Sequence, residues 1–431
     1  MRNAYNKAFK EPLSTAVQEW RDISNINFLD IFVGKLNNLA NTEATFEVES
    51  DSAQVEPLKD LCTMLRAKRF DITENMLADG DYYIFPAHNE KGEIIHTCLT
   101  QQQVRILAMD GEEITEAYGI IDWIVDSHNR VFYLLRHHKL ESNGTLSVSY
   151  SSIDDRGAKA TVPEWEYLND QAFFFTNANH IGFGRYKSPA SSRDLSPVYG
   201  VPLNFGCGKI EQDIFADLQL IRDEFKNAKS KIFADPLILR KKKNLENEEY
   251  NIPENIFPVD WRSGDIQHSI DIFNPNIRSS EHYEKLVADM ELYEKEVGTS
   301  KGILTSNETT NGATATEVKR ANADTISLLD RIHTAIDNGN RMTLQADGVF
   351  LNISPDLWAY TSDWYDPFED PSEQWGRMLE AKNNGAAESE DLIKWLFPKL
   401  TDKDRAAKME RIKAEAKADT SSALDNIFAG E

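Results

Sequence analysis

Cysteine is scarce in this chain. Of its 431 residues only Cys62, Cys98 and Cys207 are cysteines, and they lie far apart in the sequence. Three distant cysteines provide neither a disulfide framework nor the paired spacings of a zinc site. We therefore expect a protein that works in a reducing cytoplasm, with no metal and no other cofactor.

Long apolar runs are also lacking. No segment is apolar over the roughly twenty residues that a membrane-spanning helix requires. The first residues, Met1 to Lys7, lack the apolar core of a signal peptide. The hydrophobic fraction is nevertheless 41%, with 10% aromatic residues, which argues against a disordered chain. We expect one or two folded domains and no membrane partner.

Positive charge is the third shortage. Lys and Arg number 47 against 71 Asp and Glu, and the formal net charge is -24. Ordinary nucleic-acid binding needs a basic surface that displaces counterions from phosphate, so this balance speaks against it. Two interpretations of the acidity remain open. It keeps the protein soluble, or it forms a surface that repels DNA and lets it slide past without sticking.

Motifs for catalysis are absent. The segment Phe205-Gly206-Cys207-Gly208-Lys209 comes nearest to a phosphate-binding loop, but Leu203 and Ile210 stand where a Walker A motif needs glycine and a hydroxyl. His137 and His138 are adjacent, so on a strand they point to opposite faces and cannot share a metal. No serine lies in a G-x-S-x-G elbow. We therefore expect a protein that is not an enzyme.

The first part of the chain, residues 1–205, has the pattern of a mixed α/β region. Amphipathic spacing predicts helices over residues 16–39 and 58–68. Short segments of alternating or β-branched residues, separated by turn signals such as Asp110-Gly111 and Asn143-Gly144, predict antiparallel meanders. The predicted strands cover residues 82–85, 94–99, 120–125, 131–136, 146–150 and 171–176.

The pattern then changes to a helix, a charged excursion and a second helix. Apolar residues three or four apart, from Ile210 to Ile232, predict a helix within residues 206–235. Residues 236–278 carry the basic cluster Arg240, Lys241, Lys242 and Lys243 and short apolar pieces that suggest a small β module. Helical spacing resumes over residues 279–298, whose polar face is mostly acidic.

A loop rich in small and polar residues follows, over residues 299–313, and leads into the segment Thr314-Ala315-Thr316-Glu317-Val318. Thr314 and Glu317 have the spacing of a capping box, which predicts that a long helix begins here. A strand-like segment at residues 348–353 comes next, and a second strand-like segment follows at residues 358–364. Helices are predicted in the tail over residues 372–382, 389–396 and 403–417.

The order of these parts resembles the portal proteins of tailed bacteriophages, most clearly from residue 197 to residue 400. The segments that carry the resemblance are Ile221-Arg222-Asp223-Glu224-Phe225-Lys226, Lys231-Ile232-Phe233, Val297-Gly298-Thr299-Ser300-Lys301-Gly302 and Ala313-Thr314-Ala315-Thr316-Glu317-Val318. The resemblance implies an α+β portal fold. Its parts would be a wing (1–205), a first stem helix (206–235), a clip (236–278), a second stem helix (279–298), a tunnel loop (299–313), a wing return with a long helix and a strand (314–370) and a helical crown (371–431).

The resemblance also implies roles for particular residues. The acidic face of the second stem helix would line a DNA channel with Glu281, Glu284, Asp289, Glu291 and Glu294. The tunnel loop would project towards DNA with Lys301, Thr305, Ser306, Asn307, Asn311 and Gly312. The clip would contact protein partners through Arg240, Lys241, Lys242 and Lys243. For the acidic residues, the competing interpretation is the solvated face of an ordinary helix.

A portal subunit is a structural part of the virion, located at one capsid vertex and assembled in the cytoplasm of the host bacterium. By resemblance its partners would be further copies of itself in a ring, typically of about twelve subunits, with the large terminase, head-completion or adaptor proteins, and major capsid and scaffold proteins. Double-stranded DNA would pass through the ring without sequence specificity. The alternatives are another virion assembly protein, such as a minor capsid or adaptor subunit, and an enzyme with an unrecognised active site.

Overall fold

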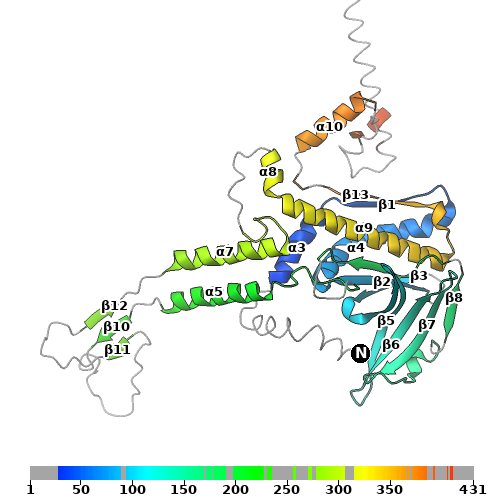
Figure 1. Cartoon of the computed structure of the whole chain (residues 1–431), viewed down its shortest axis with the longest axis horizontal. Helices are drawn as coiled ribbons and strands as arrows, with labels where there is room; N and C mark the ends of the chain where they lie inside the picture. Colours follow the sequence, from blue (N-terminus) through cyan, green and yellow to red (C-terminus); the bar gives the residue numbers. More distant parts are fainter. Residues whose placement is uncertain are drawn as a thin grey trace, which may run out of the picture. The chain divides into compact units, whose positions relative to one another are not determined.

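The computed structural model describes residues 28–88, 94–168, 171–176, 178–190, 198–227, 231–234, 256–258, 270–273, 278–305, 315–365, 367–368, 371–385, 392–393, 405 and 408–410. The chain divides into two compact units, Met1–Gly312 with Ala321–Tyr365, and Ala313–Arg320 with Asp366–Glu431. Both helices and mostly antiparallel strands are present, so the predicted α+β class is confirmed (Figure 1).

The largest sheet of the first unit is an antiparallel meander in the order β4-β5-β6-β7-β8. Tight turns join β4 to β5 and β6 to β7 where the sequence predicts them, and Gly111 and Gly144 adopt the positive φ values, 61° and 77°, that these turns require. Four predicted strands fall within this sheet, whereas β4 was not predicted. The strands are β4 (Val104–Asp110), β5 (Glu113–Val125), β6 (Val131–Leu140), β7 (Leu146–Asp154) and β8 (Ala172–Phe175).

A second, three-stranded antiparallel sheet has the order β3-β2-β9. Its strands are β2 (Asp81–His88), β3 (Ile94–Thr100) and β9 (Gly184–Lys187), and the first two confirm predicted strands. Tyr83 and Phe85 of β2 belong to one buried cluster with Val148 of β7 and Phe350. The two sheets therefore share a core.

Helices complete the first unit. α3 (Phe28–Asn41) and α4 (Glu56–Asp79) confirm two predicted helices, although α4 extends well beyond residue 68 and residues 16–27 lie outside the described part. α9 (Ala323–Leu351) is continuous, so the strand predicted at residues 348–353 is wrong. Phe350 packs into the core as part of this helix, and Asn352 ends it with a left-handed φ of 55°.

A two-stranded sheet joins distant parts of the chain. β1 (Thr45–Glu49) pairs with β13 (Ala359–Asp363) in antiparallel register, Thr45 opposite Asp363. β13 confirms the extended segment expected within residues 358–364. Short 3-10 turns connect several elements, namely η1 (Ala53–Val55), η2 (Gln101–Gln103), η3 (Pro163–Trp165) and η5 (Pro355–Leu357).

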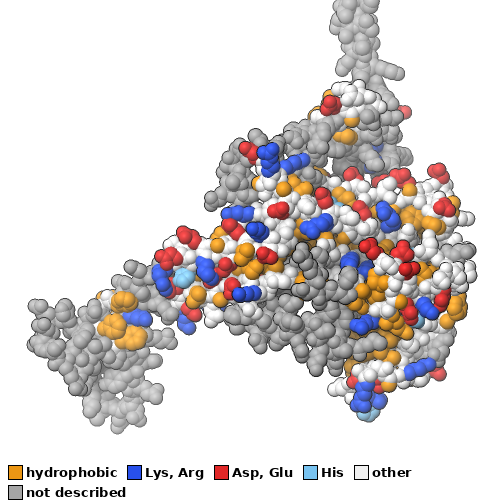
Figure 2. All heavy atoms as spheres, in the orientation of Figure 1, with side chains coloured by type: hydrophobic (Ala, Val, Ile, Leu, Met, Phe, Trp, Pro, Cys, Tyr) orange, Lys and Arg blue, Asp and Glu red, His pale blue; other side chains and the backbone are white. Residues whose placement is uncertain are grey.

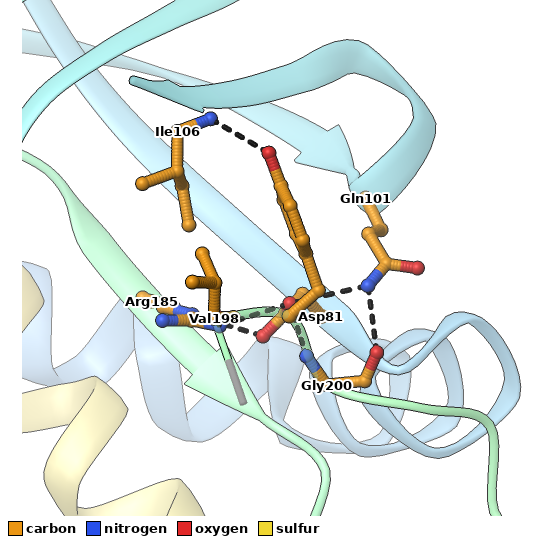
Figure 3. A network of polar contacts seen from close by, with 7 residues as sticks. Asp81, Gln101, Ile106, Arg185, Val198 and Gly200 are labelled. Atoms are coloured by element: carbon orange, nitrogen blue, oxygen red, sulfur yellow. Dashed lines mark hydrogen bonds and ion pairs between the residues drawn. The ribbon is translucent and has the colours of Figure 1, made fainter. Parts of the chain in front are cut away.

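A buried polar network fixes the segment that leads into the next helix (Figure 3). The Arg185 guanidinium of β9 donates to both carboxylate oxygens of Asp81, at 2.9 and 3.0 Å, and also to the carbonyl oxygen of Val198. The Gly200 N–H donates to Asp81 at 2.7 Å, and Gln101 donates to Asp81 and to the Gly200 carbonyl. Residues 198–200 are thereby held against β2 and β9.

The following segment contains two helices with a small sheet between them in the sequence. α5 (Gly208–Asn227) and α7 (Ser279–Val297) lie side by side in Figure 1. β10 (Lys231–Ala234) pairs in parallel with β11 (Ile256–Pro258) and in antiparallel register with β12 (Ile270–Phe273). The predicted helix at 206–235 is therefore too long. The helix ends at Asn227, and Ile232 belongs to the β module.

The second unit contains α8 (Ala315–Ala321) and α10 (Pro371–Asn383). α8 starts where the Thr314-to-Val318 pattern predicts a long helix, but α8 ends at Ala321 and the long helix is α9, which begins after Asn322. Thr314 itself lies outside the described residues. α10 confirms the helix predicted over residues 372–382. Of the other two predicted tail helices, only residues 392–393, 405 and 408–410 are described, and these are helical.

Candidate functional site

α5 and α7 form an antiparallel pair held by three cross-contacts at regular spacing. Arg278 donates to Glu224 near one end, Lys285 donates to Asp217 in the middle, and Tyr293 donates to Glu211 near the other end. Each step along α7 towards its C-terminus is matched by a step of similar length back along α5. The pairing register is therefore fixed by side chains that bond across the helix interface.

The middle contact is the shortest of the three. The Lys285 ammonium group donates to both oxygens of Asp217, at 2.6 and 2.7 Å, and to Asp289 one helical turn away at 3.3 Å. The hydrogen bond to Asp217 is the main cause that raises the pKa of Lys285. Asp217 is buried while Lys285 is half exposed, so the contact joins the interior of the pair to its surface.

The contact nearest the body of the unit is buried. The Tyr293 hydroxyl donates to the Glu211 carboxylate at 3.1 Å, and Asn204 donates to the same oxygen at 2.8 Å. Burial, followed by the charge of Glu211, raises the pKa of Tyr293, so its phenol stays protonated. α3 packs on both helices here, with Phe28 against Phe215 and Phe32 against Tyr293. The pair is therefore anchored to the unit by aromatic packing.

Two of the predicted channel-lining residues, Glu281 and Glu284, are exposed on α7. Glu291 is partly exposed and follows Glu284 by seven residues, which places the three on one stripe of the helix. The buried residues Leu286 and Tyr293 lie on a different stripe. This acidic stripe, defined as Glu281, Glu284 and Glu291, is therefore turned away from the helix interface.

Asp289 and Glu294 depart from the predicted lining. Asp289 is partly exposed but turned towards Lys285, with which it forms an ion pair. Glu294 is completely buried, so its assignment to the lining is wrong. Its carboxylate accepts hydrogen bonds from the chain that follows α7, including the Gly302 and Thr305 N–H groups at 3.3 and 3.1 Å. Helical spacing alone could not distinguish this acid from its exposed neighbours.

The described start of the predicted tunnel loop is bonded to the helices around it. Lys301, which the resemblance would direct towards DNA, forms an ion pair with Glu291. The Thr305 hydroxyl donates to Glu294 at 3.0 Å, so Thr305 is directed inward. The remaining predicted loop residues, Ser306, Asn307, Asn311 and Gly312, lie outside the described residues.

The β module that follows α5 exposes apolar side chains. The basic residues predicted as its partner contact, Arg240, Lys241, Lys242 and Lys243, lie outside the described residues. Figure 2 shows hydrophobic side chains gathered on the described strands, where Phe257, Ile272 and Phe273 are exposed. The alternation in Ile270-Asp271-Ile272-Phe273 was the available signal, and it predicted a strand but not an exposed apolar face.

Within the described ranges, no three His, Cys, Asp or Glu side chains are grouped as metal ligands would be. None of the described helices combines the length and the hydropathy that crossing a bilayer requires.

Comparison of the whole chain with models of known protein families found no matching family, and a search of curated proteins found no similar sequence.

Proposed function

We propose that this chain is a portal subunit of a tailed bacteriophage, a structural protein that forms a ring around a channel for double-stranded DNA. In this proposal α5 and α7 are the stem, the β10–β12 module is the clip, and the sheets with α3, α4 and α9 are the wing. The tail from residue 371 onward is the crown. The DNA is packaged through the ring and later leaves through it.

The observation that carries the proposal is the exposed acidic stripe on a helix pair that brackets a small β module. Glu281, Glu284 and Glu291 repeat along α7 on the side away from α5. Turned towards a channel, their carboxylates would repel DNA phosphates over roughly 10 Å at ordinary ionic strength. A surface of this kind lets a duplex move without adhering, which fits the net charge of -24.

Apolar side chains on the same two helices support assembly into a ring. Leu220 and Phe225 of α5 and Tyr283, Val287 and Leu292 of α7 are exposed by 41–53%. Large exposed apolar side chains that recur along one element mark a surface for protein contact. Because two different helices carry them, a head-to-tail contact between neighbours could cover both surfaces, and such contacts close into rings.

The partners follow from the proposed role. The exposed aromatic and aliphatic residues of the β module, together with the basic cluster at residues 240–243, would meet the large terminase during packaging and head-completion or adaptor proteins afterwards. The wing and crown would meet major capsid and scaffold proteins. The protein would be located at one vertex of the virion after assembly in the host bacterial cytoplasm.

Negative-stain electron microscopy of the purified full chain, with native mass spectrometry of the same sample, tests the proposal. We expect rings of one subunit number with a central hole of about 20 Å or more, wide enough for a DNA duplex. Because some rings of this kind assemble only with a scaffold, the chain should also be produced together with the capsid and scaffold proteins of the same virus. Closed dimers under all these conditions would refute the proposal that the chain forms a ring. The alternative that the protein is an enzyme would then be tested next.

A further inference from the structure

The carboxylate of Glu294 holds the chain that follows α7. Its Oε1 atom accepts hydrogen bonds from the N–H groups of Leu304 and Thr305, and its Oε2 atom accepts from the Gly302 N–H and the Thr305 hydroxyl. These four donors all come from residues eight to eleven positions further along the chain. The side chain is completely buried, so water does not compete for these bonds.

The same turn is fixed to two further helices. Ser300 and Thr325 of α9 exchange hydrogen bonds, the Ser300 N–H donating to Thr325 Oγ1 at 2.9 Å and the Thr325 N–H donating to Ser300 Oγ at 3.4 Å. The Lys35 ammonium group of α3 donates to the Ile303 carbonyl oxygen. We call residues 298–305 the shoulder. It is bonded to α7, α9 and α3.

Two charged contacts join the shoulder to α7: the exposed ion pair of Lys301 with Glu291, and the fully buried carboxylate of Glu294. Water screens the first far more than the second. Hydrogen bonds to a carboxylate are stronger than bonds between neutral groups, and a buried carboxylate that loses them is left without compensation. The four donors are therefore held in one arrangement relative to the last turn of α7. A displacement of that turn must either break these bonds or carry the shoulder with it.

We propose that Glu294 is a coupling residue that transmits movement of the α5–α7 pair to the backbone at residues 302–305. The transmission itself follows from the hydrogen bonds, whereas its role beside a DNA channel rests on the proposed function. In the sequence, residues 302–305 come directly before the predicted tunnel-loop residues from Ser306 onward. The state of the stem would therefore set the position from which that segment starts.

Hydrogen exchange of the purified full chain, followed by mass spectrometry of peptides that cover residues 299–305, tests the anchor. Glu294→Gln keeps the size of the side chain but removes the charge. We expect exchange at residues 302–305 to become about ten- to a hundredfold faster, the loss expected for bonds to a charged acceptor. Glu296→Gln is the matched control, because Glu296 lies in the same turn and is exposed. Unchanged exchange in Glu294→Gln would overturn the proposal.

A second variant separates coupling from simple local support. Asp217→Asn removes the negative charge that pairs with Lys285 in the middle of the helix pair, far along the sequence from the shoulder. If Glu294 transmits the change, Asp217→Asn speeds exchange at residues 302–305 by about two- to thirtyfold, and it adds nothing in the Glu294→Gln background. The proposal would be overturned if Asp217→Asn increased the exchange rate by the same factor in the unmodified protein and in Glu294→Gln. It would also be overturned if Asp217→Asn changed the exchange rate in neither.

Electron microscopy of the same samples keeps the two proposals separate. If the protein forms rings but Asp217→Asn does not change exchange through Glu294, this inference is refuted and the proposed function stands. If the change in exchange is seen but the protein never forms rings, the proposed function is refuted and the coupling through Glu294 stands. Should Glu294→Gln fail to fold, Glu294→Asp retains the charge and shortens the reach by one methylene group, and we expect the same direction of change with a smaller amplitude.

Discussion

At the scale of single residues, a buried ion pair joins Asp81 and Arg185 in the first unit. Burial by itself would lower the pKa of Arg185, but Tyr83 and Asp81 outweigh it and raise the pKa. The Asp81 side chain is fully buried, and its two oxygens accept from Arg185, Gly200 and Gln101. One carboxylate thus satisfies donors from three separate parts of the chain.

We predict that Asp81→Asn lowers the free energy of unfolding by about 3–5 kcal/mol, because it leaves the buried Arg185 charge without its counter-ion. Chemical denaturation followed by circular dichroism measures this change. Asp126→Asn is the control. Asp126 pairs with Arg130 in an exposed turn, and we expect a far smaller loss because water screens that pair. Equal losses in the two variants would show that the Asp81 network contributes no more than a surface pair.

At the scale of elements, the closest packing lies between α9 and β9. A Cβ atom at Gly339 of α9 would come within 2.2 Å of the Tyr186 ring, and one at Gly184 of β9 would come within 1.9 Å of Thr343. The Tyr186 hydroxyl donates to Asn340 at 2.9 Å across the same contact. Glycine on each side therefore lets a helix and a strand approach at a distance that no other residue allows.

We predict that Gly339→Ala destabilises the protein by about 1–3 kcal/mol, because the added methyl group must displace the ring of Tyr186 or the helix itself. Gly34→Ala is the matched control. Gly34 also lies within a helix, α3, but a Cβ atom there meets nothing within 4 Å. Alanine should raise stability at that site by roughly 0.5–1 kcal/mol through its higher helix propensity. Thermal unfolding of both variants measures the two changes in stability, which we expect to have opposite signs.

At the scale of the whole molecule, the charge balance has a direct consequence for the proposed ring. The acidic stripe lies on a surface that water reaches, so its effect on DNA is long-range and falls with salt. Lys301 offsets one of the three charges of the stripe, because its ammonium group is paired with Glu291, and Glu281 and Glu284 carry the rest. The described start of the loop therefore presents a neutralised cation to its surroundings rather than a phosphate-binding one.

We predict that the double variant Glu281→Lys and Glu284→Lys turns the assembled ring into a DNA-binding one. Its rings should retain duplex DNA at low salt and release it as the salt concentration rises, whereas unmodified rings should not bind. A mobility-shift assay across a salt series measures this. Glu112→Lys with Glu113→Lys changes the same charge at exposed positions in the turn before β5 and at its first residue, and serves as the control. Equal retention by both double variants would place the acidic stripe outside the channel.

Much of the secondary structure could be predicted because it depends on local spacing. Alternation and turn residues such as Asp110-Gly111 predicted the meander, and the three-to-four spacing of α7 predicted its apolar stripe. The misses occurred where a distant partner decided the outcome. Ile232 fits the helical stripe of α5, but pairing with Ile256 and Ile272 makes it part of a strand. Phe350 looks strand-like, but the core around Val148 accepts it as part of a helix.

The candidate site divides in the same way. Helical spacing predicts that α7 carries an acidic face, because the positions of Glu281, Glu284 and Glu291 on a helix follow from its period of 3.6 residues. It could not determine that Glu294 turns inward. That depends on Gly302, Leu304 and Thr305 folding back onto the last turn of α7. Which carboxylate meets buried donors and which meets water follows from the folded arrangement, because burial depends on segments that local spacing does not bring together.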